Sequence, residues 1–65
     1  MNILEAIKKG SKILKKSGVE TSKLDSEILM SQVIQKNRVN IILNSNNKLS
    51  KNDFISYKTL IVFLF

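Results

Sequence analysis

Few side chains in this sequence of 65 residues could carry out chemistry. It contains no histidine and no cysteine, so the commonest general base, the thiol nucleophile and the usual zinc ligands are missing. No glycine-rich turn is present that could hold the phosphates of a nucleotide cofactor. Five carboxylates remain: Glu5, Glu20, Asp25, Glu27 and Asp53. The sequence therefore predicts no catalytic, cofactor-binding or metal-binding residue, and we expect no enzyme activity from this chain by itself.

Three of the carboxylates have structural explanations. Asp25 follows Ser22 by three residues, and Asp53 follows Ser50 by three. A hydroxyl residue followed by an acid at this spacing is typical of a helix start. Glu27 lies two residues after Asp25, where we expect a favourable interaction with the dipole of the same helix. We therefore interpret Ser22 and Ser50 as N-caps and the acids as residues of the first turns.

The first helix is expected over residues 2–17. Its apolar face repeats with a period of 3.6 residues and consists of Ile3, Ala6, Ile7, Gly10, Ile13 and Leu14. The opposite face carries Lys8, Lys9, Lys12, Lys15 and Lys16. Gly18 follows where a helix usually ends in a left-handed residue. Because Gly10 lowers helix propensity on the apolar face, we interpret it as space for a closely crossing helix.

A second helix is expected from Ser22, and its apolar residues spread around most of its surface. They are Leu24, Ile28, Leu29, Met30, Val33 and Ile34. A helix that is apolar on most sides is normally covered by its neighbours, so this one should lie at the centre of the core. Residues 37–43 are rich in β-branched side chains that also suit a strand. A single strand would have no partner, however, which favours a short helix, and residues 44–48 are predicted to form a loop.

The last helix is expected to begin after Ser50. Its apolar stripe consists of Phe54, Tyr57, Leu60, Ile61 and Leu64. Short connections join antiparallel neighbours in helical bundles. The sequence thus predicts a single all-α domain over residues 1–65, a small bundle of four to five short helices.

The net charge of +6 is compatible with binding to nucleic acid or to an anionic membrane. Arginine is the residue expected where phosphates or guanine edges are held by two hydrogen bonds, yet Arg38 is the only one and the other basic residues are lysines. The basic residues therefore do not favour nucleic acid as a partner. Two alternatives stay open: a stand-alone basic helical protein that binds nucleic acid, and a membrane-surface protein anchored by its C-terminal residues.

The C-terminal residues are unusually apolar. The run from Leu60 to Phe65 is six residues long, whereas a membrane span needs about 20, so we predict no membrane span. Val62, Phe63 and Phe65 extend the apolar surface beyond the stripe of the last helix, and exposed surface of this kind favours association. We expect self-association through this end, unless Leu64 and Phe65 fold back into the core. No signal peptide is recognisable at the start of the sequence, and together with the missing cysteines this favours the cytoplasm.

One stretch is similar to a known family. Residues 18–34 contain Leu24-Asp25-Ser26-Glu27-Ile28-Leu29, followed by Arg38 and then by Leu49-Ser50. In this order and spacing they resemble the N-terminal domain of peptide chain release factor glutamine methyltransferases, the HemK/PrmC family, with Ser26 in place of the family's common alanine. The resemblance covers about residues 3–61. It ends where the family continues with a charged segment and a Gly-x-Pro stretch, whereas this chain has Val62-Phe63-Leu64-Phe65.

The resemblance implies a helical substrate-recognition domain that helps bind a class-1 release factor. In the family, a Rossmann-like domain that binds S-adenosylmethionine methylates the N5 amide of a glutamine in the release factor. The glycine motif and the Asn-Pro-Pro-Tyr loop of that catalytic domain have no counterpart in this sequence. The resemblance therefore transfers no catalytic or cofactor-binding residue to this chain, and it assigns no partner-binding residue.

Overall fold

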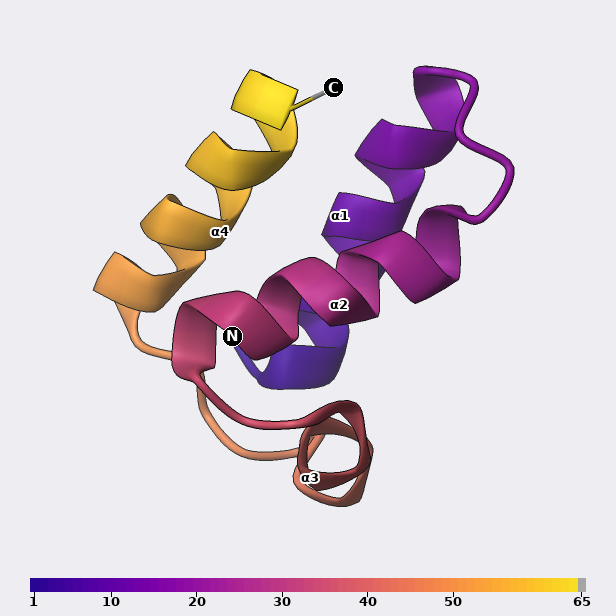
Figure 1. Ribbon diagram of the computed structural model, residues 1–65. Coiled ribbons are helices and arrows are strands. Elements are labelled where there is room, and N and C mark those ends of the chain that lie inside the picture. The colour runs from indigo at the N-terminus through magenta and orange to yellow at the C-terminus, as the bar shows by residue number, and fades with distance from the viewer. Residues whose placement is uncertain (65) are drawn as a thin grey trace.

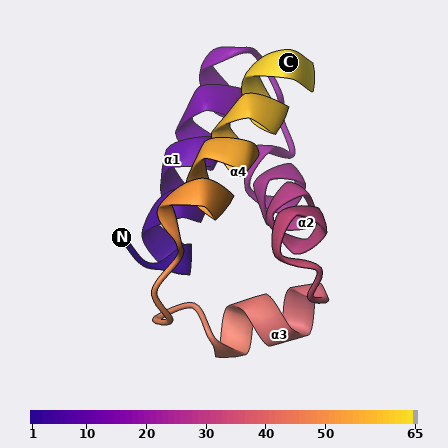
Figure 2. The same ribbon diagram turned by 90° about the vertical axis from the view of Figure 1, so that its left-hand side faces the viewer.

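The computed structural model describes residues 1–64, with the side chain of Leu64 left out. This part of the chain forms four helices, α1 (Ile3–Lys16), α2 (Ser22–Ile34), α3 (Arg38–Leu43) and α4 (Lys51–Leu64) (Figure 1). Helices α1 and α4 lie side by side, α2 crosses both of them, and α3 closes one end of the bundle (Figures 1 and 2). The predicted all-α bundle is confirmed, with four helices rather than five in the described residues.

The start of α1 is held by its own cap and by a distant loop. The side chain of Asn2 accepts a hydrogen bond from the Glu5 amide at 2.8 Å, and the Glu5 carboxylate accepts one from the Asn2 amide at 3.3 Å. The amides of Ile3 and Leu4 donate to the carbonyls of Asn47 and Ser45. These bonds satisfy the donors that the first turn of a helix leaves free. The asparagine-rich loop before α4 is therefore tied to the start of α1.

The end of α1 has the predicted left-handed glycine. Gly18 adopts a φ of +87°. Its amide donates to the Lys15 carbonyl at 3.0 Å, and the Val19 amide reaches back to the Leu14 carbonyl at 3.0 Å. This pair of bonds is the Schellman motif. Val19 also packs against the core, which fixes the direction in which the chain leaves the helix.

The predicted N-cap of α2 is wrong by one residue. Thr21 occupies the cap position, and its side chain makes no capping hydrogen bond to the backbone. Instead, its hydroxyl donates to the Asp25 carboxylate at 3.0 Å. Ser22 is the first helical residue, and its buried hydroxyl accepts a hydrogen bond from Ser11 of α1 at 3.4 Å. Because α1 packs against α2, the Ser22 hydroxyl bonds to Ser11 and does not cap the helix as the sequence pattern predicted.

The end of α2 is strained at Gln35. This residue has φ 56° and ψ 44°, a left-handed conformation, and the next amide, from Lys36, donates to the Ser31 carbonyl at 3.1 Å. A residue with a Cβ atom costs about 1–2 kcal/mol in this conformation, whereas glycine adopts it freely. We therefore expect Gln35→Gly to raise the free energy of unfolding by about 0.5–1 kcal/mol. Urea unfolding measures this, and the control Lys36→Gly, at a residue without positive φ, should lower it.

Helix α2 is the central helix, as predicted, but not all of its apolar residues are buried. It contacts each of the other three helices. Leu29 and Met30 belong to the core, whereas Leu24 and Ile28 remain 40% and 39% exposed. The full core consists of Ile3, Ala6, Ile7, Leu14, Leu29, Met30, Ile41, Leu49, Tyr57 and Ile61. Leu24 and Ile28 lie on the side of α2 that no other helix covers.

The starts of α3 and α4 follow the expected cap chemistry. Asn37 accepts a hydrogen bond from the Asn40 amide at 2.7 Å, which caps α3. Ser50 accepts one from the Asp53 amide at 3.1 Å, so the predicted N-cap of α4 is confirmed. Only Ile41 of α3 is buried, because the short helix touches the bundle with one side. The short-helix prediction for residues 37–43 holds.

Helices α1 and α4 cross closely at Gly10, as its position on the apolar face predicts. A Cβ atom at Gly10 would meet the hydroxyl of Tyr57 and would stand 2.7 Å from Cδ1 of Ile61. Beyond this crossing α4 turns apolar residues outward: Val62 is exposed, and Phe63 is 85% exposed. The expectations for the Leu64 side chain and for Phe65 lie outside the described residues.

Candidate functional site: a groove between the first three helices

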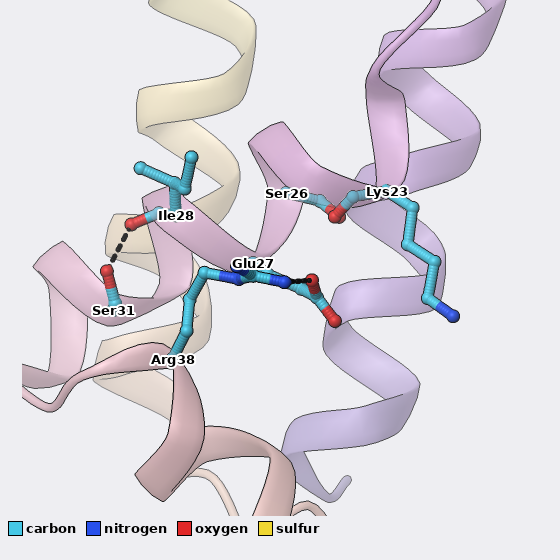
Figure 3. Close-up of polar contacts among 6 residues, drawn as sticks. All are labelled: Lys23, Ser26, Glu27, Ile28, Ser31 and Arg38. Atoms are coloured by element: carbon cyan, nitrogen blue, oxygen red, sulfur yellow. Dashed lines mark hydrogen bonds and ion pairs between the residues drawn. The ribbon is translucent and has the colours of Figure 1, made fainter.

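An ion pair joins α2 to α3. Nη2 of Arg38 donates to Oε1 of Glu27 at 3.1 Å (Figure 3). The Glu27 side chain is only 12% exposed, whereas that of Arg38 is 46% exposed. Glu27 was expected to act in the first turn of its helix, and this role is wrong because Asp25 is the acid there. Its structural role is to hold Arg38, 11 residues away.

Two serines of α2 satisfy their own hydroxyl groups. The buried Ser26 donates to the Lys23 carbonyl at 2.7 Å, and Ser31 donates to the Ile28 carbonyl at 2.6 Å (Figure 3). Such bonds let a hydroxyl be buried inside a helix without a partner from another element. This explains how the Ser26 hydroxyl can be buried in α2.

A buried tyrosine links α4 to α2. The hydroxyl of Tyr57 donates to the Ser26 carbonyl at 3.1 Å, and the ring is almost completely buried. Burial raises the pKa of the Tyr57 phenol to about 12, and the nearby charge of Glu27 adds to this, while the side chain of Ser26 partly opposes it. The phenol therefore stays neutral and donating at any physiological pH.

The raised pKa of Tyr57 makes stability depend on alkaline pH. Below pH 10 the phenol is neutral in both states, so its contribution to the free energy of unfolding is fully present. Between pH 10 and 12 the phenol of the unfolded chain ionises first, and about 1 kcal/mol of the free energy of unfolding should be lost by pH 11. Urea unfolding at pH 9 and pH 11 measures this loss. Tyr57→Phe should show less pH dependence over this range, since all other titrating groups are common to both proteins.

A groove of about 610 Å³ lies between α1, α2 and α3. Its apolar lining consists of Leu4, Ile7, Ile41 and Ile42. Lysines of α1 and α2 stand around it, among them Lys8, Lys12 and Lys23. Glu27 also lines the groove, and its charge is balanced by Arg38. Figure 3 shows Lys23 extending on the same side of α2 as this ion pair. The groove thus has an apolar interior and is surrounded mainly by basic side chains.

A second apolar surface follows the outer side of α4. Ile55, Val62 and Phe63 are exposed there and lie beside Lys51 and Lys58. The spacing of these residues places them on one side of the helix. Phe54 borders the same surface, packs partly against the core, and has the ammonium of Lys9 5.9 Å from its ring centroid. The described part of the chain leaves the outer side of α4 uncovered.

The structure scatters the carboxylates that the sequence singled out. Glu5 serves the cap of α1, Asp25 pairs with Thr21, Glu27 pairs with Arg38, and the Asp53 amide bonds to Ser50. Within residues 1–64 no cluster of three or more potential metal-ligating side chains is found. No helix among these residues has the length and apolar character needed to span a bilayer. The groove was missed by sequence reasoning, because it is assembled from three helices.

The comparison with known proteins agrees with the resemblance seen in the sequence. A family model described as the PrmC N-terminal domain matches residues 5–62. The match begins in the first turn of α1 and ends in the last turns of α4, so it includes all four helices. Neither a curated protein nor a solved structure matched the chain. Since the family model covers most of the sequence, this chain belongs to the PrmC N-terminal domain family.

Proposed function

We propose that this domain binds a class-1 peptide chain release factor and supplies recognition, not chemistry, to a PrmC-type methyltransferase. The family match over residues 5–62 carries the proposal. In such an enzyme a separate domain binds S-adenosylmethionine and methylates a glutamine amide. An amide nitrogen is a poor nucleophile, so the reaction depends on orienting the substrate. Binding energy gained at a remote helical domain can be used for that orientation. The expected compartment is the cytoplasm.

Two titrations test the proposal. Isothermal calorimetry of the chain with a purified class-1 release factor should give saturable binding. Titration with S-adenosylmethionine should show no binding tighter than a Kd of about 100 μM, equivalent to roughly −5.5 kcal/mol. A tight complex with the methyl donor, or methyl transfer by the chain alone, would contradict the non-catalytic role. Binding to nucleic acid with a steep salt dependence would favour the alternative of a nucleic-acid-binding protein. Partition of the chain onto anionic vesicles would favour the alternative of a membrane-surface protein.

We further propose that this chain associates weakly with itself through the outer side of α4. The exposure of Val62 and Phe63 on a side that no other helix covers supports this. Sedimentation velocity at high micromolar concentration should show dimers or larger species. Val62→Ser with Phe63→Ser should remove them without changing the circular dichroism spectrum. A wild-type chain that stays monomeric would contradict self-association.

A further inference from the structure

We infer that the groove between α1, α2 and α3 receives an acidic amphipathic helix of the release factor. The inference rests on the proposed function and names the surface and the chemistry by which it would operate. Protein grooves of this kind take up the apolar side of a partner helix, while charges around the groove select its flanks. The groove offers both parts of such a site, an apolar lining and surrounding charges that are positive except for Glu27, which is paired with Arg38.

The apolar part of the groove is accessible from outside. Ile7 and Ile41 are buried at its base. Leu4 of α1 and Ile42 of α3 stand above them and remain partly exposed, although both are large apolar side chains. Surface of this kind, contributed by two helices and surrounded by charges, is characteristic of protein–protein contact sites.

The charges around the groove specify an acidic partner. Lys8 and Lys12 are four residues apart on α1, so they lie on the same side of the helix, and Lys23 stands across from them on α2. Because Glu27 is paired with Arg38, its negative charge does not compensate the positive charges of these lysines. A partner helix with acidic residues at the same four-residue spacing would match Lys8 and Lys12. Charge complementarity of this kind steers association and determines which partner fits.

The same groove is poorly suited to nucleic acid. Phosphates gain nothing from the isoleucine and leucine side chains inside it, and its described lining contains no aromatic side chain on which a base could stack. Its basic groups are lysines, since Arg38 is engaged by Glu27. The observations therefore favour a protein partner, and nucleic acid is kept as an outcome of the test.

The first experiment changes the charges. The Kd for a purified class-1 release factor is measured by calorimetry for the wild-type chain and for Lys8→Glu with Lys12→Glu, which should weaken binding at least about tenfold. The control is Lys51→Glu with Lys58→Glu, which makes the same change of charge at exposed residues of α4, outside the groove. It should change the Kd less than about threefold, as for charges distant from an interface. Circular dichroism confirms that all variants fold.

The second experiment changes the apolar lining. Ile42→Ser removes an apolar side chain of the groove that is 52% exposed, so it should weaken binding at least about fivefold without unfolding the chain. The matched control is Val39→Ser on the same helix, which is 65% exposed and lies outside the groove. It should leave the Kd unchanged.

The outcomes separate the groove from the proposed function. If the wild-type chain binds the release factor and the groove variants behave like their controls, the groove is not the binding site, while the proposed function stands. If the wild-type chain does not bind the release factor, the proposed function is wrong and the groove assignment falls with it. If the lysine variant loses binding, Ile42→Ser keeps it and a single-stranded oligonucleotide displaces the release factor, the groove is an anion site for nucleic acid.

Discussion

Met30→Ala is expected to lower the free energy of unfolding by about 2–5 kcal/mol, the range for emptying a buried methionine or leucine site. Met30 is completely buried on α2, the helix that touches all three others. A domain of this size has a total stability of about 3–10 kcal/mol. The thermal midpoint of the variant should therefore fall by at least about 8 °C. Thermal unfolding followed by circular dichroism measures the change.

Ile28→Ala provides the matched control for Met30→Ala. Ile28 lies on the same helix, two residues away, yet it is 39% exposed on the uncovered side of α2. Its replacement should cost less than about 1 kcal/mol, because little apolar surface leaves the core. If both substitutions lowered the free energy of unfolding equally, the side of α2 that packs against the other helices would differ from the one in the structure.

The places where helices start and stop could be predicted where the chain itself carries the signal. Gly18 ends α1 because only glycine adopts a φ of +87° without strain. Ser50 caps α4 because the hydroxyl and the amide that it accepts from are three residues apart. Asn2 and Glu5 formed a recognisable capping box as well, and an Asn-x-x-Glu pattern could have revealed it. In each of these features the interacting groups are close in sequence, so the sequence alone is enough to predict them.

The errors arise where tertiary packing competes with a local pattern. Ser22 has the spacing of a cap, but α1 packs against it and Ser11 bonds its hydroxyl. Leu24 and Ile28 look like core residues, yet no element of the bundle reaches their side of α2. Glu27 pairs with Arg38 across two helices, and no rule of helix spacing connects residues 11 positions apart. The groove also depends on how three helices pack against one another, so it could not be predicted from the sequence.

Gly10→Val is expected to lower the free energy of unfolding by about 3 kcal/mol or more, beyond the usual 1–3 kcal/mol for overpacking, because α1 and α4 meet at this residue. The first carbon of any side chain would overlap the hydroxyl of Tyr57 and would lie 2.7 Å from both Cζ of that ring and Cδ1 of Ile61. The ring cannot move aside easily, since it is buried and its hydroxyl is bonded to the Ser26 carbonyl at 3.1 Å. The helices would have to separate, which exposes core surface and breaks this bond.

A series of substitutions at Gly10 separates this steric effect from helix propensity. Alanine is the better helix former by about 1 kcal/mol, so propensity alone predicts that Gly10→Ala stabilises the domain. The structure predicts the opposite, a loss that increases from Gly10→Ala to Gly10→Val. Because Tyr57→Phe removes the nearest oxygen atom, Gly10→Ala should cost less in that background, with a coupling energy of about 0.5–3 kcal/mol. Urea unfolding of the four proteins measures the coupling. A stabilising Gly10→Ala, or additive effects in the cycle, would show that α1 and α4 do not cross closely at Gly10.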